Sequence, residues 1–412
     1  MTEAPHPKQR AGARLADLEE LEVRVEKLVE GGDGLARFEG IPIFVPRSAP
    51  GDRLRVRLSE RRPSYGRAEI VEILEPGAGR REAPCPHYEQ CGGCALQHLE
   101  ETTQLRYKAQ SVRETLRRIG GVETPSNITV VPGRPWGYRL RTQLHVGEGI
   151  RGTEVGYFAR GSHDLVAVHS CPVLVPELEA ALPELPQRLV GSSHRRIDLT
   201  AGDGDRWTHA PPIEGLPRGE VASCIGGLVY SYDARCFFQG HRQLAPALIE
   251  HALDAPRIGE AEREGTVYDL FAGVGLFSLP LARHYRRVVA VESDRVASRF
   301  NRRNAKRNQI TNLDVELQSV ESWIPKLPQS PARVIVDPPR LGLSHRVRRT
   351  LAKRRPKHLT YVSCNAATLA RDLKQLGPGF RIDSMALLDM FPQTGHMEVV
   401  VQLLDREAYP ES

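Results

Sequence analysis

The second half of this chain alternates apolar stretches with stretches of helical pattern, and this alternation limits the fold more than any other feature. Apolar runs at 267–271, 288–292, 334–336 and 359–362 have the length of buried strands. Strands that alternate with helices form a largely parallel sheet covered by helices on both faces. We therefore predict a doubly wound α/β, Rossmann-like domain over residues 237–412.

Two glycines and an acid in this region point to a nucleoside cofactor. Gly273 and Gly275 follow the first strand, where glycine lets a ligand approach the backbone closely. Glu292 ends the next strand, where a carboxylate can accept hydrogen bonds from both ribose hydroxyls. Ser278 stands where a dinucleotide fingerprint has its third glycine. The spacing favours S-adenosylmethionine over NAD, and a tight strand–helix link without a ligand is the alternative.

Polar residues also flank the later strands. Asp337 leaves the third strand through two prolines that fix it at the carboxyl edge of the sheet. Arg340 follows the two prolines. In methyltransferases that act on adenine amino groups an aromatic residue stands at this position, so that chemistry is disfavoured. Cys364 follows the fourth strand, where nucleophiles are commonly placed, and Glu398 precedes the last strand and could act as a base. The alternatives are structural roles: Asp337 as a cap of a rigid turn, Cys364 as a buried thiol and Glu398 as a structural carboxylate.

The first half of the chain reads differently. Residues 1–18 are polar, and we expect them to be disordered. Residues 19–76 contain four or five short alternating strands separated by glycine turns, which predicts a small OB-like β-barrel. Barrels of this size often bind single-stranded nucleic acid, although many only mediate contacts between domains. Residues 77–236 form a strand-rich central domain, with one helix expected over 102–119.

Four cysteines are spaced for a metal site. Cys85, Cys91 and Cys94 lie within ten residues, and Cys171 follows far downstream. Four thiolates can hold zinc or a [4Fe–4S] cluster. Zinc ribbons show two close cysteine pairs and this chain shows one, so the cluster is favoured. The Cys-x3-Cys-x2-Cys spacing of radical enzymes is absent, which favours a structural or RNA-positioning cluster, with unliganded buried thiols as the alternative.

Positive charge is gathered in two runs. The chain has a net charge of +6. Six arginines and one acid lie between residues 53 and 67, and seven basic residues and no acid lie between residues 346 and 357. Such runs usually form a solvated face, but two of them favour contact with nucleic acid.

Nothing in the sequence predicts a membrane partner. No apolar run approaches the roughly 18 residues that a membrane span needs. The N-terminus lacks the apolar stretch of a secretory signal. We expect a cytoplasmic, monomeric protein.

Taken together, these motifs resemble the RNA 5-methyluridine methyltransferase family. The resemblance is carried by Asp-Pro-Pro-Arg at 337–340, Ser-Cys-Asn-Ala-Ala-Thr-Leu-Ala-Arg-Asp at 363–372 and Gly-His-Met-Glu at 395–398. The four-cysteine set resembles the iron–sulfur branch of the family, which methylates 23S ribosomal RNA. The barrel resembles the family's TRAM domain, so the resemblance covers nearly the whole chain.

The resemblance implies an S-adenosylmethionine-dependent RNA (uracil-C5) methyltransferase. In such an enzyme Cys364 would add to carbon 6 of uracil, and Glu398 would remove the carbon 5 proton after methyl transfer. The family pattern also implies which residues contact S-adenosylmethionine. These are Gln239, Phe271, Gly273, Glu292 and Asp337, with Phe271 and Glu292 flanking the adenosine.

Three alternatives differ in substrate or class. The same chemistry on transfer RNA is disfavoured by the cluster and the barrel. An inactive RNA-binding or assembly factor is disfavoured by the presence of both Cys364 and Glu398. A cytosine methyltransferase usually has a Pro-Cys pair at its nucleophile, which is absent around Cys364. We therefore expect RNA as the partner, with 23S ribosomal RNA favoured.

Overall fold

The computed structural model describes residues 15, 18–125, 128–150, 152–255 and 258–410. The chain divides into two compact units. The first contains the residues up to Val112 with two short inserts, 159–161 and 392–396, and the second contains the rest. Apart from Leu15 and Leu18, the tail predicted to be disordered lies outside the described residues.

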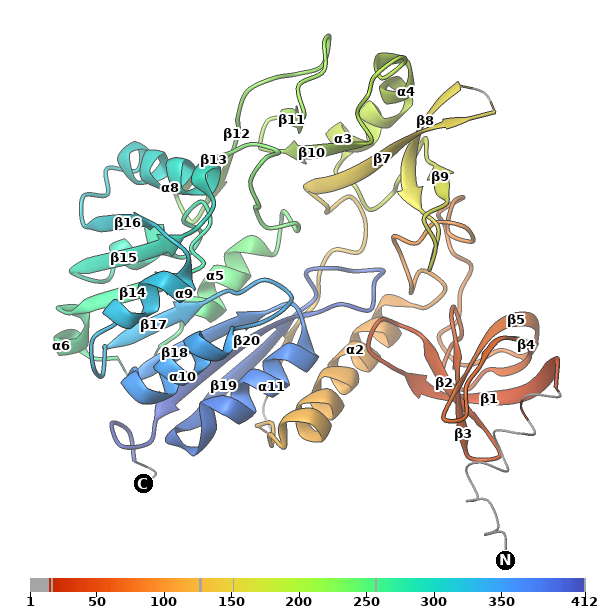
Figure 1. Ribbon diagram of the computed structural model, residues 1–412, viewed down its shortest axis with the longest axis horizontal. Coiled ribbons are helices and arrows are strands. Elements are labelled where there is room, and N and C mark those ends of the chain that lie inside the picture. The colour runs from red at the N-terminus through yellow and green to blue at the C-terminus, as the bar shows by residue number, and fades with distance from the viewer. Residues whose placement is uncertain (1–14, 16–17, 126–127, 151, 256–257, 411–412) are drawn as a thin grey trace, which may run out of the picture. The chain divides into compact units, whose positions relative to one another are not determined.

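Five strands of the first unit close into a barrel in the order β1-β2-β3-β5-β4 (Figure 1). They are β1 (Glu20–Leu28), β2 (Gly34–Phe38), β3 (Ile41–Val45), β4 (Arg53–Arg61) and β5 (Gly66–Glu75). Along β1, Leu21, Val23 and Val25 are buried and the residues between them are exposed, because successive side chains of a strand point to opposite faces. The buried residues form the barrel core together with Ile43 and Leu54. The prediction of a small β-barrel is confirmed.

One helix follows the cysteine-rich segment, as the sequence predicts. α2 spans Glu101–Thr115 and continues as a π-helical turn, η1 (Leu116–Gly120). Gly121 ends the helix with a φ of 62°, a left-handed conformation that glycine adopts without a steric penalty.

A five-stranded antiparallel sheet and a hairpin form the strand-rich part of the second unit. The sheet has the order β11-β10-β7-β8-β9, and β12 pairs with β13. The strands are β7 (Arg141–Gly149), β8 (Gly152–Phe158), β9 (Leu165–Ala167), β10 (Arg196–Ala201), β11 (Trp207–Ala210), β12 (Val221–Ile225) and β13 (Leu228–Tyr232). Between β9 and β10 lie α3 (Pro176–Ala181), η2 (Leu182–Glu184) and α4 (Leu185–Arg188). The predicted strand-rich central part is confirmed.

An eight-stranded sheet is the scaffold of the second unit, in the order β16-β15-β14-β17-β18-β20-β19-β6. Its strands are β6 (Thr129–Val131), β14 (Thr266–Leu270), β15 (Arg287–Glu292), β16 (Leu313–Leu317), β17 (Arg333–Val336), β18 (His358–Ser363), β19 (Phe380–Leu388) and β20 (Glu398–Asp405). The five strands from β14 to β18 pair in parallel, which confirms the predicted α/β architecture. The alternation of strand and helix then ends, because β19 and β20 form an antiparallel hairpin.

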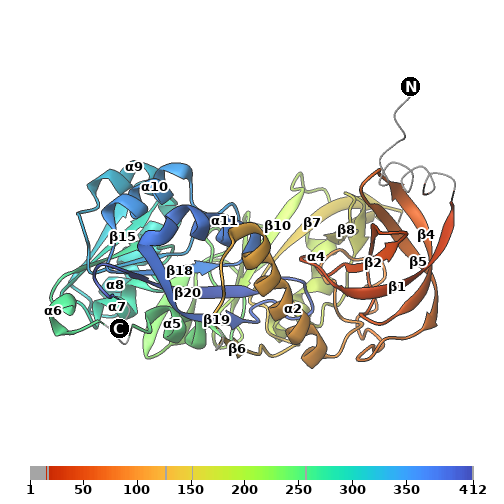
Figure 2. The ribbon, with the colours of Figure 1, turned by 90° about the horizontal axis from the view of Figure 1, so that it is seen from below.

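Helices cover both faces of this sheet. They are α5 (Ala245–Leu253), α6 (Glu260–Arg263), α7 (Ser278–Ala282), α8 (Arg295–Arg307), α9 (Val320–Trp323), η3 (Ile324–Lys326), α10 (His345–Arg354), α11 (Ala366–Leu376) and η4 (Gly377–Gly379). Figure 2 shows α9, α10 and α11 on one face and α5 and α7 on the other. No helix within the described ranges is long and apolar enough to cross a membrane.

The edge strand β6 comes from outside the region predicted to form this sheet. Residues 129–131 pair in parallel with 386–388 of β19. They belong to the stretch 77–236 that the sequence assigns to a central domain. The boundaries proposed from the sequence stay predictions, but the sheet draws strands from both sides of the boundary at residue 236.

Candidate active site at the carboxyl edge of the sheet

Most of the predicted site residues follow neighbouring parallel strands. β14 pairs with β15 on one side and with β17 on the other. Where the connections from two neighbouring parallel strands run to opposite sides of a sheet, a crevice opens beyond the carboxyl ends of those strands. Phe271 and Gly273 follow β14, Glu292 ends β15, and Asp337 directly follows β17. The structure therefore brings these four residues to one edge, as their positions in the sequence predict.

The turn after β14 is tied to the end of β15. The backbone N–H groups of Phe271 and Ala272 both donate to the carbonyl of Val291, at 3.0 and 3.1 Å. The N–H of Gly273 donates to Glu292 Oε2 at 2.8 Å. Phe271 has a φ of 67°, a strained conformation for a residue with a side chain. Turn and acid are thus held as one structural unit.

The two glycines of this turn serve different purposes. Gly273 has a φ of 53°, and a Cβ there would meet no atom within 4 Å, so the space beside it is open to a ligand. Gly275 has a φ of 98°, and a Cβ there would clash with Leu279 and with Asn301 of α8. Gly273 leaves room for a cofactor, whereas Gly275 allows close packing of the turn on its own helix and on α8.

A buried carboxyl lies beneath the turn. Asp269 of β14 is fully buried and accepts a hydrogen bond from the Ser278 hydroxyl. Its Oδ1 atom is buried without a partner among the described residues. Burial, reinforced by the charge of Glu292, raises the pKa of Asp269 to about 7 against the hydrogen bond from Ser278, which lowers it. Asp269 begins the motif that ends in the two glycines, but no site role was predicted for it from the sequence.

Asp337 extends this arrangement of acids. Burial and the neighbouring charge of Asp269 raise the pKa of Asp337 to about 7. Acids therefore follow one another along the edge from Glu292 through Asp269 to Asp337. A site of this kind favours a cationic ligand group, such as an amino or sulfonium group.

The direction of β20 explains why Cys364 and Glu398 come together. β18 and β20 are antiparallel, and Ser363 pairs with Val399. Cys364 follows Ser363, and Glu398 precedes Val399, so continuing the register places them opposite each other. Opposite residues in an antiparallel pair have Cα atoms roughly 4.5–5.5 Å apart. The structure thus places the two predicted catalytic residues at the same edge as the glycine turn.

Local contacts fix the backbone on both sides of Cys364. Asn365 caps α11, its side chain accepting the N–H of Thr368 at 3.0 Å. The Thr368 hydroxyl donates to the carbonyl of Arg340 at 3.2 Å. The Asp-Pro-Pro-Arg loop and the turn that carries the thiol are therefore joined to each other.

The charged neighbours of Cys364 shift the pKa of its thiol in opposite directions. Burial and the nearby Glu398 raise the pKa of Cys364 to about 11, Asp337 adds to the rise, and Arg340 lowers it. Glu398 is 4% exposed, and burial together with Asp337 raises its pKa well above the usual range, again against Arg340. The thiol therefore holds its proton at neutral pH, and the carboxyl keeps its proton to a higher pH than usual. Arg340 is the cation that favours their ionised forms.

Gln239, the remaining predicted cofactor residue, lies in the same unit. It is 5% exposed and follows Phe238. Phe238 packs in one hydrophobic cluster with Val274 and Leu276 of the glycine turn. The segment that carries Gln239 is therefore packed against the turn by its apolar neighbour.

The four predicted cluster ligands are all thiols and not disulfides. Each is partly exposed, and the N–H of Gly93 donates to Cys91 Sγ at 3.3 Å. Cys85, Cys91 and Cys94 lie in the first unit and Cys171 in the second. The donor chemistry fits an iron–sulfur cluster. In the part of the chain that the structure describes, no three Cys, His, Asp or Glu side chains gather into a metal-binding group.

The arginine run of the barrel is largely neutralised. Five of its six arginines pair with carboxylates that come mostly from other strands: Arg53 with Glu75, Arg55 with Glu72, Arg57 with Glu20, Arg62 with Glu60, and Arg67 with Glu60 and Asp33. The sixth, Arg61, donates to the carbonyl of Leu18. The expected contact of this run with nucleic acid stays a prediction, and the structure shows that the run is not a strip of unpaired cations.

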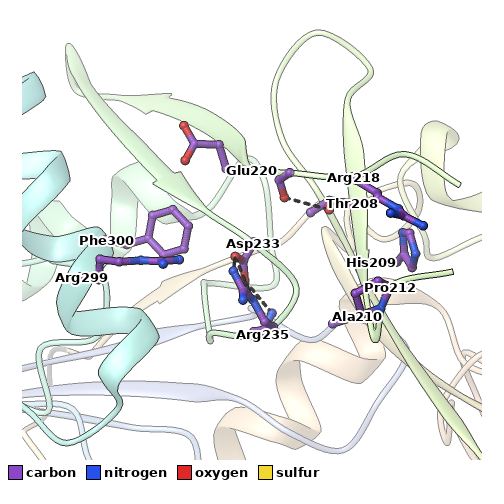
Figure 3. A pocket seen from close by; sticks show the side chains of 11 residues that line it. Thr208, His209, Ala210, Pro212, Arg218, Glu220, Asp233, Arg235, Arg299 and Phe300 are labelled. Atoms are coloured by element: carbon purple, nitrogen blue, oxygen red, sulfur yellow. Dashed lines mark hydrogen bonds and ion pairs between the residues drawn. The ribbon is translucent and has the colours of Figure 1, made fainter. Parts of the chain in front are cut away.

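A hollow also lies beside α8, and it was not predicted from the sequence. It has a volume of about 340 Å³ and lies between α8, the segment after β13 and the region from β11 to β12. Figure 3 shows Arg299 and Phe300 of α8 on one side, Asp233 and Arg235 in the middle and His209 on the other side. In the sequence, the basic residues of α8 are separated by apolar and polar residues, so they do not form an unbroken run of charge.

Comparison with known proteins agrees with this geometry. Residues 225–327 and 328–406 match the tRNA (Uracil-5-)-methyltransferase family, and residues 18–71 match the TRAM domain. The 23S rRNA (uracil(1939)-C(5))-methyltransferase RlmD of Pectobacterium atrosepticum is 33% identical over 440 residues, which cover 97% of each chain. An uncharacterized RNA methyltransferase of Synechocystis sp. is 32% identical and covers 93% of this chain and 95% of its own.

A solved structure extends the likeness to three dimensions. The tRNA (uracil-54, C5)-methyltransferase of Pyrococcus abyssi, in complex with S-adenosyl-L-homocysteine, is 26% identical with a TM-score of 0.72. The match covers 93% of this chain and 100% of that one. With a 33% identical relative matched along nearly the whole of both chains, this chain belongs to the S-adenosylmethionine-dependent RNA uracil-C5 methyltransferases that carry an N-terminal TRAM domain.

Proposed function

We propose that this enzyme methylates carbon 5 of a uridine in 23S ribosomal RNA, with Cys364 as the nucleophile and Glu398 as the base. The observation that carries the proposal is the pairing of Ser363 with Val399, which puts the thiol and the carboxyl at adjoining strand ends. Both lie at the edge that holds the glycine turn and Asp337. An enzyme that must act on both carbons of the uracil double bond needs a nucleophile and a proton acceptor within reach of the same uracil ring.

Cys364 opens the reaction because carbon 5 of uracil is too weak a nucleophile by itself. The thiolate forms a bond to carbon 6, and the electrons of the double bond move to give an enolate with nucleophilic character at carbon 5. S-adenosylmethionine supplies the methyl group, whose bond to the sulfonium sulfur breaks as the bond to carbon 5 forms. The target base must leave any helical stack to reach such a site.

Glu398 then completes the exchange. Its carboxylate takes the proton from carbon 5, and the electrons of that C–H bond restore the double bond. The bond between carbon 6 and Cys364 breaks, and the thiolate leaves. Because burial raises the pKa of both groups, Arg340 has the role of favouring their ionised forms in the working enzyme.

The cofactor would lie along the carboxyl edge from β15 to β17. Glu292 would accept hydrogen bonds from the ribose hydroxyls, and Phe271 would cover the adenosine. Open space beside Gly273 leaves room for the ligand. Asp337 and Gln239 would hold the methionine part, where a partly buried carboxylate stabilises a positive charge.

The choice of 23S ribosomal RNA rests on likeness at the level of the whole chain. The relative from Pectobacterium atrosepticum named for 23S rRNA is 33% identical, whereas the structural relative named for tRNA is 26% identical. Transfer RNA is the second candidate, because that second protein matches 93% of this chain in three dimensions. The RNA partner itself follows from the family, and its class is what an experiment must decide.

The test uses RNA that carries 5-fluorouridine. Fluorine at carbon 5 cannot leave as a proton, so methyl transfer would trap the enzyme on the RNA. We expect a covalent adduct on 23S fragments in the presence of S-adenosylmethionine, and none with Cys364→Ala. An adduct on transfer RNA alone would reassign the substrate. If wild-type protein binds the cofactor but forms no adduct on either RNA, the uridine mechanism is wrong and an RNA-binding factor becomes the better explanation.

We also propose that Cys85, Cys91, Cys94 and Cys171 hold a [4Fe–4S] cluster that has no part in methyl transfer. The supporting observations are the four partly exposed thiols and the amide that donates to Cys91. Iron and sulfide analysis of anaerobically purified protein, with the absorption spectrum, tests it. We expect four irons per chain, lost in Cys91→Ala and kept in Cys224→Ala, which changes an exposed thiol outside the set. Zinc in place of iron, or no metal at all, would contradict the proposal.

A further inference from the structure

The outer face of α8 is basic along its whole length. The helix has no acidic residue, and its basic side chains are all exposed: Arg295, Arg299, Arg302, Arg303, Lys306 and Arg307. Its opposite face is buried, with Ala297, Phe300 and Asn304 toward the rest of the unit. The side of α8 that faces solvent is therefore a row of positive charges.

Part of this charge is already engaged within the protein. Arg302 donates to the carbonyl of Val315 at 2.7 Å, and Arg303 pairs with Glu220. Arg307 donates to the Ser231 hydroxyl at 3.0 Å. These three arginines bind α8 to its neighbours, so they are not unpaired cations.

Two arginines at the hollow beside α8 lack a carboxylate. Asp233 pairs with Arg235, with 3.1 Å between Oδ2 and Nε. For Arg299 and Arg218, no ion pair with a described acid exists, and both side chains are exposed. They lie on opposite sides of the hollow in Figure 3, Arg299 on α8 and Arg218 on the segment before β12.

The histidine of the hollow does not add a charge. The N–H of Ile213 donates to His209 Nε2 at 2.8 Å, so His209 Nδ1 carries the proton and donates to the carbonyl of Pro217 at 2.8 Å. Burial and the nearby Arg218 lower the pKa of His209, which keeps the ring neutral. Arg218 and Arg299 therefore supply the free positive charge.

This surface adjoins the cofactor edge. α8 begins three residues after Glu292, and its capping residue Asp294 is an electrostatic neighbour of Cys236. Arg235 precedes Cys236 and lies four residues before Gln239. The two segments that line the hollow, α8 and the residues after β13, also lead to the carboxyl edge where the cofactor would bind. The hollow lies one turn or more further along α8.

We propose that the hollow and the outer face of α8 bind the RNA backbone next to the target uridine, with Arg218 and Arg299 each contacting a phosphate. The proposal rests on the proposed function, because it assigns the binding of that enzyme's own substrate. Arginine matches phosphate through its planar fork of donors. A hollow of about 340 Å³ lies within the range of small-ligand sites and admits part of a nucleotide. In the barrel, by contrast, the arginine run already has carboxylate partners.

The test measures the salt dependence of RNA binding. Full-length protein is titrated with fluorescein-labelled single-stranded oligouridine at several salt concentrations. Each lost phosphate contact lowers the slope of log Kd against log salt by about 0.7 for single-stranded RNA. The double variant Arg218→Gln/Arg299→Gln should therefore lose about 1.4 from the slope and bind about tenfold more weakly at physiological salt. Its affinity for S-adenosylmethionine should not change.

The matched control is the double variant Arg286→Gln/Arg283→Gln, which removes the same charge from exposed arginines outside α8 and the hollow. It should keep the wild-type slope. An unchanged slope in the first variant, or an equal loss in both, would overturn the proposed surface. The adduct on 5-fluorouridine RNA reports separately on the wild-type enzyme. If the Arg218→Gln/Arg299→Gln variant loses RNA binding but the wild-type enzyme forms no adduct, the proposed surface is supported and the proposed chemistry is rejected. If the wild-type enzyme forms the adduct but the slope of this variant is unchanged, the chemistry is supported and the surface is rejected.

Discussion

Glu398 begins β20 at the edge of the sheet where Cys364 has just left β18. The antiparallel pairing of these strands, with Ser363 opposite Val399, is what brings together two residues that are 34 positions apart in the chain. If β20 ran parallel to β18, its first residue would lie at the far edge. The reversed strand therefore brings the proposed base to the edge that carries the proposed nucleophile.

Replacing the base should stop the reaction after methyl transfer. In Glu398→Gln the amide has nearly the same shape but cannot take the carbon 5 proton, so we expect a covalent adduct with ordinary uridine RNA. Turnover should fall by about 10²- to 10⁴-fold. Denaturing gels with RNA and a labelled methyl donor measure both. Glu260→Gln, an exposed change on α6, should turn over normally. Absence of any adduct in Glu398→Gln would mean that this residue acts before methyl transfer.

The activity should rise with pH through the neutral range. The pKa of Cys364 is raised to about 11 and that of Glu398 is raised as well, and the reaction needs both in their ionised forms. We expect kcat/KM to increase from about pH 6.5 to about pH 9.5, without a plateau near pH 7.

Arg340 should set the position of this pH profile. Arg340→Gln removes the cation that lowers the pKa of both groups, so the profile should move to higher pH. The rate at neutral pH should then fall by about three- to tenfold. Arg346→Gln, an exposed change on α10, is the control and should leave the profile in place. A lower rate in Arg340→Gln with an unmoved profile would assign Arg340 to RNA binding instead.

Asp269 should make the fold less stable as pH rises. Its pKa is about 7 when folded, above the ordinary value of 3.8, so the folded state holds the proton more tightly. The free energy of unfolding therefore decreases between about pH 4 and pH 7, because over this range the carboxyl is ionised in the unfolded chain but still protonated in the folded one. Asp269→Asn should remove that decrease and gain on the order of 2–3 kcal/mol at pH 8 relative to wild type.

Urea denaturation at pH 5 and at pH 8 measures this difference. Asp314→Asn, which breaks an exposed pair with Arg287, should change stability by no more than about 1 kcal/mol at either pH. Equal stability of Asp269→Asn and wild type at pH 8 would show that the carboxylate is stabilised by contacts that outweigh its burial.

A buried amide pair should hold the loop before Glu398. Gln104 Nε2 donates to Gln393 Oε1 at 2.9 Å, and the N–H of Gln393 donates to Gln104 Oε1 at 3.1 Å. Gln104→Ala leaves buried polar groups of Gln393 without these partners, which should cost about 2–3 kcal/mol of stability. We also expect a lower kcat with little change in cofactor affinity, because residues 392–396 lead directly to the base.

Denaturation and steady-state kinetics on the same preparations measure both effects. Gln110→Ala, an exposed change on the same helix, should alter stability by no more than about 0.5 kcal/mol. A destabilised Gln104→Ala with an unchanged kcat would show that the loop does not position Glu398.

Sequence patterns were sufficient for the local parts of this protein. The apolar runs marked β14, β15, β17 and β18, because buried parallel strands are apolar throughout. Residues that follow parallel strands meet at one edge whatever the details of packing, so Gly273, Glu292 and Asp337 could be placed together in advance. The alternating pattern of β1 likewise indicated a barrel with one buried face.

Partnerships between distant segments required the tertiary structure. Arg55 lies in a run of arginines in the sequence, but its carboxylate partner, Glu72, comes from the neighbouring strand. The basic face of α8 is spread along a helix and becomes a surface only when Arg218 from another segment joins it. The sequence by itself therefore determined the four parallel strands and the edge at which the proposed reacting groups lie, since these depend on local pattern and strand direction. Which charges remain unpaired, and which strands border the sheet, was decided by long-range packing, because pairing depends on neighbours that are far apart in the chain.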